Sequence, residues 1–164
     1  MIILGIDPGF ATIGYGVISV EGGRIRPVDY GTIQTPKDKT FPQRLVMIER
    51  GINTLIDTYH PDEIALEELF FNTNITTGIN VAHARGVLLL ASIHACGCLY
   101  EYTPLQIKQA MTGYGRADKK QIQEMVRVYL GLQKVPKPDD AADALAVALT
   151  HIQTGGFSDK FSIK

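Results

Sequence analysis

The sequence predicts an α/β fold with a mixed five-stranded sheet and helices on both faces. Residues 2–7 form a near-continuous apolar run, typical of a strand buried on both faces. Two more strands follow through a tight glycine turn at residues 21–23. Beyond residue 40, helical and strand patterns alternate, as in parallel strands joined by helical crossovers. The first three strands are therefore expected to be antiparallel, and the others parallel to the first.

The first half of the chain is predicted to hold four strands and one helix. The strands are expected at residues 2–7, 13–20, 24–34 and 63–67, and the first, buried one should be central. The helix is expected at residues 41–59, because apolar residues recur there at spacings of three and four.

The second half is predicted to begin with a loop at residues 70–77 and a long helix at residues 78–95. A fifth strand at residues 98–102 and helices at residues 104–111, 117–130 and 139–152 follow. The 78–95 helix is apolar nearly all round, so one face can cover the sheet while the other needs a further cover. We therefore expect a homodimer formed through this helix.

The length of 164 residues suits one domain with a substantial core, expected over residues 1–153, followed by a loose tail at 154–164. The only two cysteines, Cys96 and Cys98, are expected to be buried reduced thiols. No basic leader precedes the first strand, and the apolar run at residues 87–98 looks too short to cross a bilayer. These features predict a cytoplasmic protein with no membrane partner.

Four acidic residues stand where predicted strands end or where the last helix begins. Asp7 ends the first strand, Glu67 ends the fourth, and Asp140 and Asp143 lie on one face of the last helix. Carboxylates that end strands of an α/β sheet converge at one edge, where ligands usually bind. Repulsion among them is relieved by a hard cation, and oxygen ligands favour Mg²⁺ or Mn²⁺. The pattern predicts a divalent-metal site.

Each acidic residue also has a plainer explanation. Asp7, before a proline and a glycine, can simply open a turn. Glu68 competes with Glu67, although strand alternation allows only one of them to face Asp7. Asp139 or Asp140 can cap the last helix, whereas Asp143 lies one turn inside it.

A basic stretch and an exposed aromatic residue suggest a nucleic-acid partner. Residues 105–137 hold seven basic and two acidic side chains, although the net charge of the whole chain is −1. Such a run can supply phosphate contacts, and its plainer explanation is a solvated helix face. Phe70 lies in a polar loop, where it can stack on bases or fold back onto the core.

These motifs, in this order, resemble the RNase H-like nuclease superfamily and, more narrowly, the RuvC-type Holliday-junction resolvases. The resemblance runs from residue 3 to about residue 152, so it does not depend on a single motif. The matching segments are residues 3–9, 12–18, 65–70, 84–87, 106–109 and 140–146.

The resemblance implies a homodimeric, Mg²⁺-dependent crossover junction endodeoxyribonuclease that nicks two opposed strands of four-way junction DNA. It implies two ions per site, with Mn²⁺ as a substitute, and a junction-bound branch-migration helicase complex as a partner. The residues it implies are Asp7, Glu67, Asp140 and Asp143 as metal-binding catalytic carboxylates, Phe70 as a base-unstacking aromatic, and Lys108 and Lys119 near the DNA backbone. The basic run adds Arg116 and Lys120 as DNA-binding candidates.

Three other functions remain open from the residues. An actin-like ATPase or sugar kinase also ends its first strand in an aspartate, but such proteins need two lobes. A non-catalytic nucleic-acid-binding module has no reason to keep four repelling acids near phosphates. Another RNase H-like nuclease, such as an RNA:DNA hybrid hydrolase, shares the carboxylates but not the remaining motifs.

Overall fold

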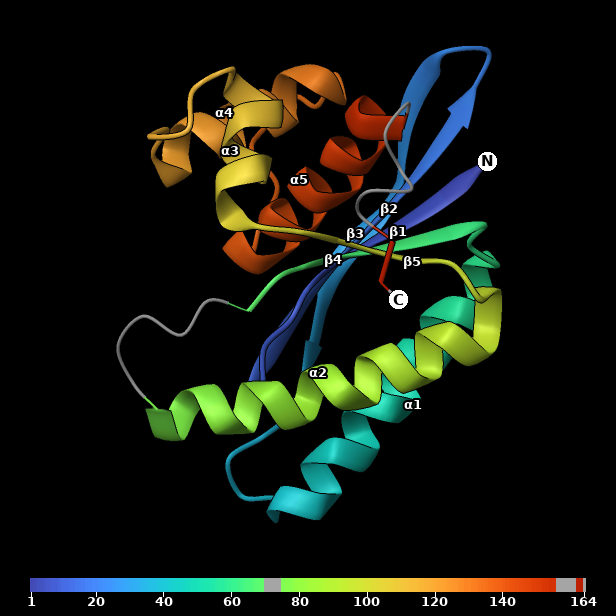
Figure 1. The fold of residues 1–164 in the computed structure, drawn as a ribbon, viewed down its shortest axis with the longest axis vertical. Coiled ribbons are helices and arrows are strands. Elements are labelled where there is room, and N and C mark those ends of the chain that lie inside the picture. The colour runs from blue at the N-terminus through green and yellow to red at the C-terminus, as the bar shows by residue number, and fades with distance from the viewer. Residues whose placement is uncertain (70–74, 156–161, 164) are drawn as a thin grey trace.

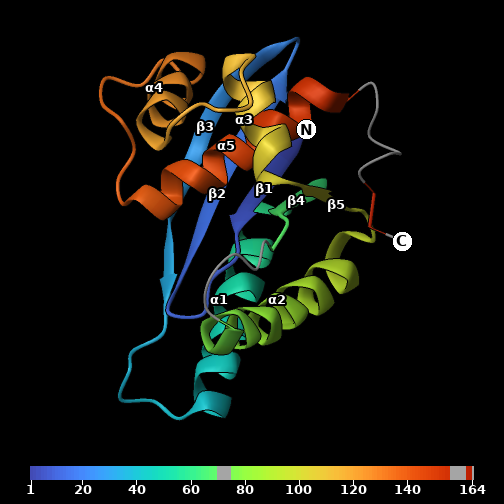
Figure 2. The same cartoon turned by 60° about the vertical axis from the view of Figure 1, so that its left-hand side comes forward.

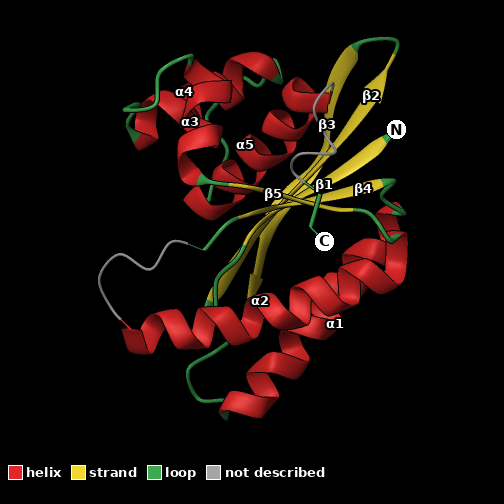
Figure 3. Ribbon diagram, viewed as in Figure 1, coloured by secondary structure: helices red, strands yellow, loops and turns green. Residues whose placement is uncertain are grey.

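The computed structural model describes residues 1–69, 75–155 and 162–163 and shows a five-stranded sheet in the order β3-β2-β1-β4-β5 (Figures 1 and 3). β1 pairs antiparallel with β2, and β2 pairs antiparallel with β3. β1 pairs parallel with β4, and β4 with β5, so the predicted mixed sheet is confirmed. The strands are β1 (Ile2–Asp7), β2 (Thr12–Glu21), β3 (Arg24–Gln34), β4 (Glu63–Glu67) and β5 (Leu99–Tyr102).

Helices cover both faces of the sheet, as the sequence predicts (Figure 2). One face carries α1 (Phe41–Tyr59) and α2 (Ile75–Cys96), and the other carries α3 (Pro104–Thr112), α4 (Lys119–Tyr129) and α5 (Asp139–Thr154). Successive side chains of β1 point to opposite faces, so Ile3 packs in the core under α5 and Leu4 in the core under α1 and α2. This arrangement explains why β1 is apolar without alternation.

Glycines let α5 lie directly on the sheet. A Cβ atom added at Gly14 would stand 2.0 Å from the carbonyl oxygen of Asp140, and one at Gly5 would stand 2.2 Å from that of Ala144. The helix contributes small side chains in return, including the fully buried Ala141 and Ala148. This backbone-to-backbone contact fixes the beginning of α5 beside the end of β1 and the beginning of β2.

Several element boundaries differ from those predicted. α4 begins at Lys119, not residue 117, because the Asp118 side chain accepts a 2.9 Å hydrogen bond from the Gln121 amide and caps the helix. The capping explanation for Asp139 and Asp140 is wrong, since Pro138 is the N-cap of α5 and both aspartates lie in its first turn.

The outer side of α2 is apolar and exposed. Ala84, Leu88 and Ser92 are buried, whereas Leu90 is 59% exposed and Ile79 is 50% exposed. Residues 78–96 are long and apolar enough, by length and composition alone, to cross a membrane, so the sequence argument from length does not hold. The helix nevertheless packs one side against the sheet and α1.

The chain after α2 and after α5 shows two further departures. Cys96 is half-buried, but Cys98 is exposed, so the expected burial is wrong for Cys98. Ser162 forms a bridge with Tyr100, and the Ile163 amide donates to the carbonyl oxygen of Leu99 at 2.9 Å. Those two residues lie beside β5, and the rest of the expected loose tail from residue 156 is outside the described residues.

Candidate active site

Asp7 and Glu67 lie at the same edge of the sheet because they end two neighbouring parallel strands. In the β1–β4 register, Ile6 stands opposite Leu66, which places the two following carboxylates side by side. The glycine contact described above brings the first two turns of α5, with Asp140 and Asp143, over this edge. The structure thus gathers the four predicted carboxylates from β1, β4 and α5.

The electrostatics show how closely these carboxylates interact. Burial raises the pKa of Asp7 to about 8, and the charges of Glu67, Asp143 and Asp140 add to the rise. Burial also raises the pKa of Glu67 to about 7, with Asp143 as the main acidic neighbour. The pKa of Asp143 is raised by burial as well. Each group therefore holds its proton longer than an isolated carboxyl would.

Lys119 supplies the nearest positive charge. Its Nζ lies 2.8 Å from Oδ2 of Asp143 and 3.8 Å from Oδ2 of Asp139. Burial alone lowers the pKa of Lys119, but the hydrogen bond to Asp143 and the acidic neighbours outweigh it and raise the pKa. Among the described residues, the carboxylates of Asp7 and Glu67 have no hydrogen-bond or ion-pair partner. One lysine therefore leaves most of the negative charge uncompensated.

A cleft of about 220 Å³ opens beside the carboxylates. Its lining includes the acidic Glu67, Asp118 and Asp143 and the basic Lys108 and Lys119. Lys108 lies near enough to lower the pKa of Glu67. The cleft is thus lined by acids that repel one another and by cations that attract phosphate.

The residues present fit a divalent metal by their chemistry. Every donor offered by Asp7, Glu67, Asp140 and Asp143 is a carboxylate oxygen, which suits hard cations. In the described part of the chain, no three acidic, His or Cys side chains converge tightly enough to ligate one ion as they stand. Lys119 takes one oxygen of Asp143 instead. An ion would therefore require small side-chain movements, including release of this contact.

The other predicted site residues lie at different distances from the cleft. Arg116 and Lys120 are exposed, on the α3–α4 loop and in the first turn of α4. Asp139 pairs with Lys137 at 2.6 Å, so it is already neutralised. Glu68 uses its amide to donate to the Tyr102 carbonyl, and it is not among the charges that shift the pKa of Asp7. Phe70 lies outside the described residues.

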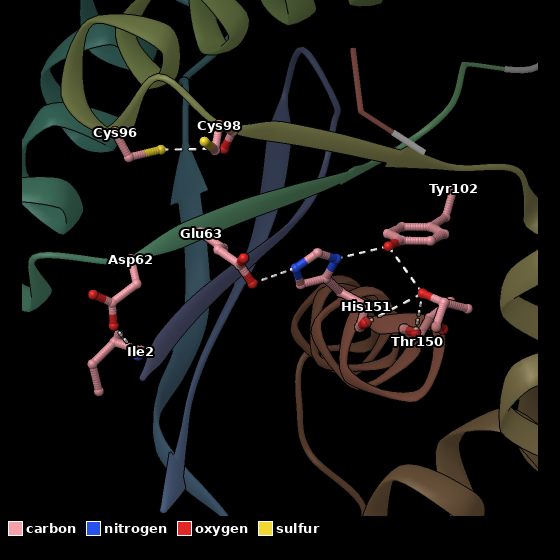
Figure 4. Close-up of polar contacts among 9 residues, drawn as sticks. Ile2, Asp62, Glu63, Cys96, Cys98, Tyr102, Thr150 and His151 are labelled. Atoms are coloured by element: carbon pink, nitrogen blue, oxygen red, sulfur yellow. Dashed lines mark hydrogen bonds and ion pairs between the residues drawn. The ribbon is translucent and has the colours of Figure 1, made fainter. Parts of the chain in front are cut away.

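Sequence reasoning missed two polar contacts that hold the sheet edges. Arg85 of α2 forms a close ion pair with Glu101 of β5. His151, near the end of α5, bonds Glu63 at the beginning of β4 and, through its other ring nitrogen, the hydroxyl of Tyr102, whose backbone stands opposite Glu67 in β5 (Figure 4). The partners in each case lie far apart along the chain, so no spacing in the sequence could indicate them.

One protein family and many of its named members match nearly the whole chain. A family model described as crossover junction endodeoxyribonuclease RuvC matches residues 3–151. The chain belongs to this family. The crossover junction endodeoxyribonuclease RuvC of Alkaliphilus oremlandii is 56% identical over 164 residues, which cover the whole of both chains. That of Desulfitobacterium hafniense is 58% identical over 152 residues, 92% of each.

Solved RuvC structures confirm the fold assignment. The structure titled as Thermus thermophilus RuvC in complex with a Holliday junction substrate matches with a TM-score of 0.93 and 34% identity, covering 99% of each chain. The yeast mitochondrial Holliday junction resolvase Ydc2 matches with a TM-score of 0.69 at 15% identity, a similarity of fold alone. The predicted resemblance to RuvC-type enzymes is therefore confirmed over nearly the full chain.

Proposed function

We propose that this RuvC-family chain resolves four-way DNA junctions by nicking two opposed strands with the help of divalent metal. The observation that carries the proposal is the cluster of four carboxylates from β1, β4 and α5, whose charge Lys119 only partly offsets. The match to relatives named for crossover junctions over their whole length supplies the substrate class. In recombination and repair, such cleavage separates joined duplexes.

Asp7, Glu67, Asp140 and Asp143 would hold the metal, proposed as two Mg²⁺ ions with Mn²⁺ as a substitute. When bound, such ions activate a water molecule and stabilise the leaving 3′ oxygen of a phosphodiester. The protein's own contribution is to keep these carboxylates partly buried, so that water screens their charge poorly and a cation is held firmly. No protein nucleophile is required for this reaction.

The cations of the cleft would position the scissile phosphate. Lys108 and Lys119 line the cleft, and α3 and α4 are N-capped beside it by Thr103 and Asp118. α3 has no acidic residue at its N-terminus, so its dipole adds positive potential there, whereas the Asp118 carboxylate offsets the dipole of α4. Arg116 and Lys120 extend this charge outward along the bound DNA, as contacts that position without reading sequence.

We further propose that the active form is a two-fold dimer sealed by α2. The exposed residues Ile79, Leu90 and Ile93 share its outer side, and Val46 of α1 adds to the apolar surface. A groove of about 320 Å³ between α1 and α2 is ready to accept side chains of a partner. A second copy is the natural occupant because two-fold interfaces bury the same surface on both subunits.

The dimer is tested by placing a charge on that surface. Leu90→Asp should yield monomers in sedimentation velocity at micromolar concentration, while Val128→Asp on α4, which is 53% exposed, should leave the dimer intact. A monomeric parent protein, or a Leu90→Asp variant that sediments like the parent, contradicts the assignment.

Two partner contacts rest on family resemblance. Phe70 would hold an unstacked base at the junction centre, which predicts that Phe70→Ala slows cleavage about 5- to 150-fold, the effect of losing one stacked base. The loss should shrink on junctions with unpaired bases at the crossover. A branch-migration helicase complex on the same junction, in the cytoplasm, is the proposed setting.

The whole assignment is tested with a labelled synthetic four-way junction, a matched duplex and an RNA:DNA hybrid, each with and without Mg²⁺. We expect paired nicks in the junction only, and only with metal. Preferential cleavage of the hybrid would favour another RNase H-like nuclease. Junction binding without any nicking would favour a non-catalytic binding module.

A further inference from the structure

A second cavity adjoins the carboxylate cleft. It has a volume of about 470 Å³ and lies between the α3–α4 loop and α4. Tyr114 and Met125 provide apolar surface, and the polar groups come from Asp118, Lys120, Gln121 and Glu124. Ala117 and Asp118 line both this cavity and the cleft. The two spaces are therefore neighbours, and Ala117 and Asp118 lie between them.

The loop that presents Tyr114 is held in place by its own contacts. α3 ends at Gly113, which has a left-handed φ of 70° and donates its amide to the Gln109 carbonyl at 2.8 Å. The Thr112 hydroxyl accepts from the Tyr114 amide at 3.2 Å and lies 3.0 Å from the Tyr114 carbonyl oxygen. A fixed loop presents its side chain without a large ordering cost on binding.

The Tyr114 side chain is exposed, although the backbone of its loop is held by hydrogen bonds. It is 57% exposed, and its hydroxyl has no hydrogen-bond partner in the part of the chain that the structure describes. Two exposed cations lie near it, Lys120 in the cavity lining and Arg116 two residues on, and the acidic Asp118 and Glu124 line the cavity as well. An exposed aromatic ring with a lysine beside it can bind an unpaired nucleotide, by stacking on the base and pairing with its phosphate.

We propose that this second cavity is a nucleobase subsite for the strand being cleaved, with the Tyr114 ring as its stacking platform and Lys120 at the neighbouring phosphate. The inference rests on the proposed junction-cleaving function and adds a contact that the carboxylate site does not supply. Because the two cavities share Ala117 and Asp118, the contacted base lies within a few nucleotides of the scissile phosphate.

The experiment measures junction binding without catalysis, in EDTA, by the parent protein and by Tyr114→Leu, Tyr114→Phe and Tyr129→Leu variants. Tyr129 is 41% exposed at the other end of α4, about 15 Å along the helix, and serves as the matched control. We expect Tyr114→Leu to bind the junction about 5- to 150-fold more weakly. Tyr114→Phe, which keeps the ring, and Tyr129→Leu should bind like the parent.

Single abasic sites placed one to four nucleotides on either side of the scissile phosphate then identify the contacted base. At one position, the abasic junction should weaken binding of the parent by the same factor, and Tyr114→Leu should lose nothing further there. A Tyr114→Leu loss that persists undiminished on every abasic junction would mean a backbone or structural role and would overturn the subsite. Unchanged binding by Tyr114→Leu would overturn it as well.

The same panel separates this inference from the function on which it rests. A parent protein that neither binds nor nicks the junction contradicts the proposed function, and the subsite with it. A parent that binds and nicks the junction, with no coupling between Tyr114 and any base, contradicts the subsite alone.

Discussion

β4 carries a glutamate at each end, and the two have opposite surroundings. Glu63, where the strand begins, accepts a 2.7 Å hydrogen bond from Nε2 of His151 (Figure 4). Glu67, where the strand ends, faces Asp7 and Asp143 and has no hydrogen-bond partner among the described residues. α5 spans both environments, with Asp140 and Asp143 near its beginning and His151 near its end.

Glu63 belongs to a hydrogen-bonded network that joins β4, β5 and α5. Nε2 of His151 lies 2.7 Å from the Glu63 carboxylate, Nδ1 lies 2.7 Å from the Tyr102 hydroxyl oxygen, and Thr154 donates to that oxygen at 3.0 Å. His151 and Tyr102 are almost fully buried, and the Tyr100 ring packs at a tilt against the imidazole, with ring centroids 4.3 Å apart. Every polar group there stabilises the fold, whereas the carboxylates at the Glu67 end of β4 (the near end) are left for a cation. The comparison separates residues that support the fold from residues held ready for chemistry.

The largest expected effect on cleavage comes from replacing the two glutamates of β4 with glutamine, one at a time. Glu67→Gln should lower the junction-cleavage rate on the order of 10³-fold, because a metal ligand worth several kcal/mol is lost, and should leave junction binding intact. Glu63→Gln should cleave at nearly the parent rate. Single-turnover cleavage at fixed Mg²⁺ measures both rates. Equal losses of cleavage rate in the two variants would contradict the different roles assigned to Glu63 and Glu67.

A methyl group at the contact between α5 and the sheet should damage both the fold and the site. Gly14→Ala would drive a Cβ into the Asp140 carbonyl, so we expect it to lower the free energy of unfolding by about 3 kcal/mol and to slow cleavage. Gly155→Ala, which has no described atom within 4 Å of its Cβ, should do neither. Urea denaturation compares them, and a stable, fully active Gly14→Ala would show that the close contact is unnecessary.

Breaking the network of Glu63, His151 and Tyr102 should lower stability without changing the cleavage rate. His151→Phe removes the histidine partner of Glu63 and one of the partners of the Tyr102 hydroxyl, which should lower the free energy of unfolding by roughly 1–3 kcal/mol. For a chain of this length that corresponds to about 2–4 °C in Tm per kcal/mol. Cleavage per folded molecule, measured well below Tm, should match the parent. A selective loss of cleavage would place His151 in the chemistry.

The smallest effect is a pH dependence confined to the near end. Because the pKa values of Asp7 and Glu67 are raised to about 8 and 7, the metal-free folded state binds protons that the unfolded state has released. Its free energy of unfolding should therefore fall as pH rises from about 5 to 8, by at least about 1 kcal/mol. Asp7→Asn should flatten this fall, and the exposed-loop control Asp38→Asn should not.

Mg²⁺ provides the complementary test of the same groups. Saturating metal should oppose the fall in stability toward pH 8, because binding to the ionised carboxylates stabilises the folded state. Thermal melts at several pH values with EDTA or Mg²⁺ measure this. A metal-free protein that becomes more stable between pH 5 and 8 would contradict the electrostatic picture of the near end.

Much of the architecture could be predicted from the sequence because its signals are local. The apolar run of β1 and the helical periodicity of α1 depend only on neighbours along the chain, and the predicted bounds of both match the structure within a residue. The strand-end positions of Asp7 and Glu67 follow from the same patterns, since parallel neighbouring strands end at one edge. The order of the motifs was sufficient to indicate the family.

Only the tertiary structure decided which side chains meet. The pairing of Glu63 with His151, the approach of Lys119 to Asp143 and the cavity beside Tyr114 join residues on different elements. Which side of α2 faces outward also depends on how the helix sits on the sheet, because nearly all of it is apolar. The periodicity of a sequence indicates which face of a single helix or strand is apolar. A contact between two elements depends on how both of them pack. Here the close approach of α5 to the glycines of the sheet determined that packing.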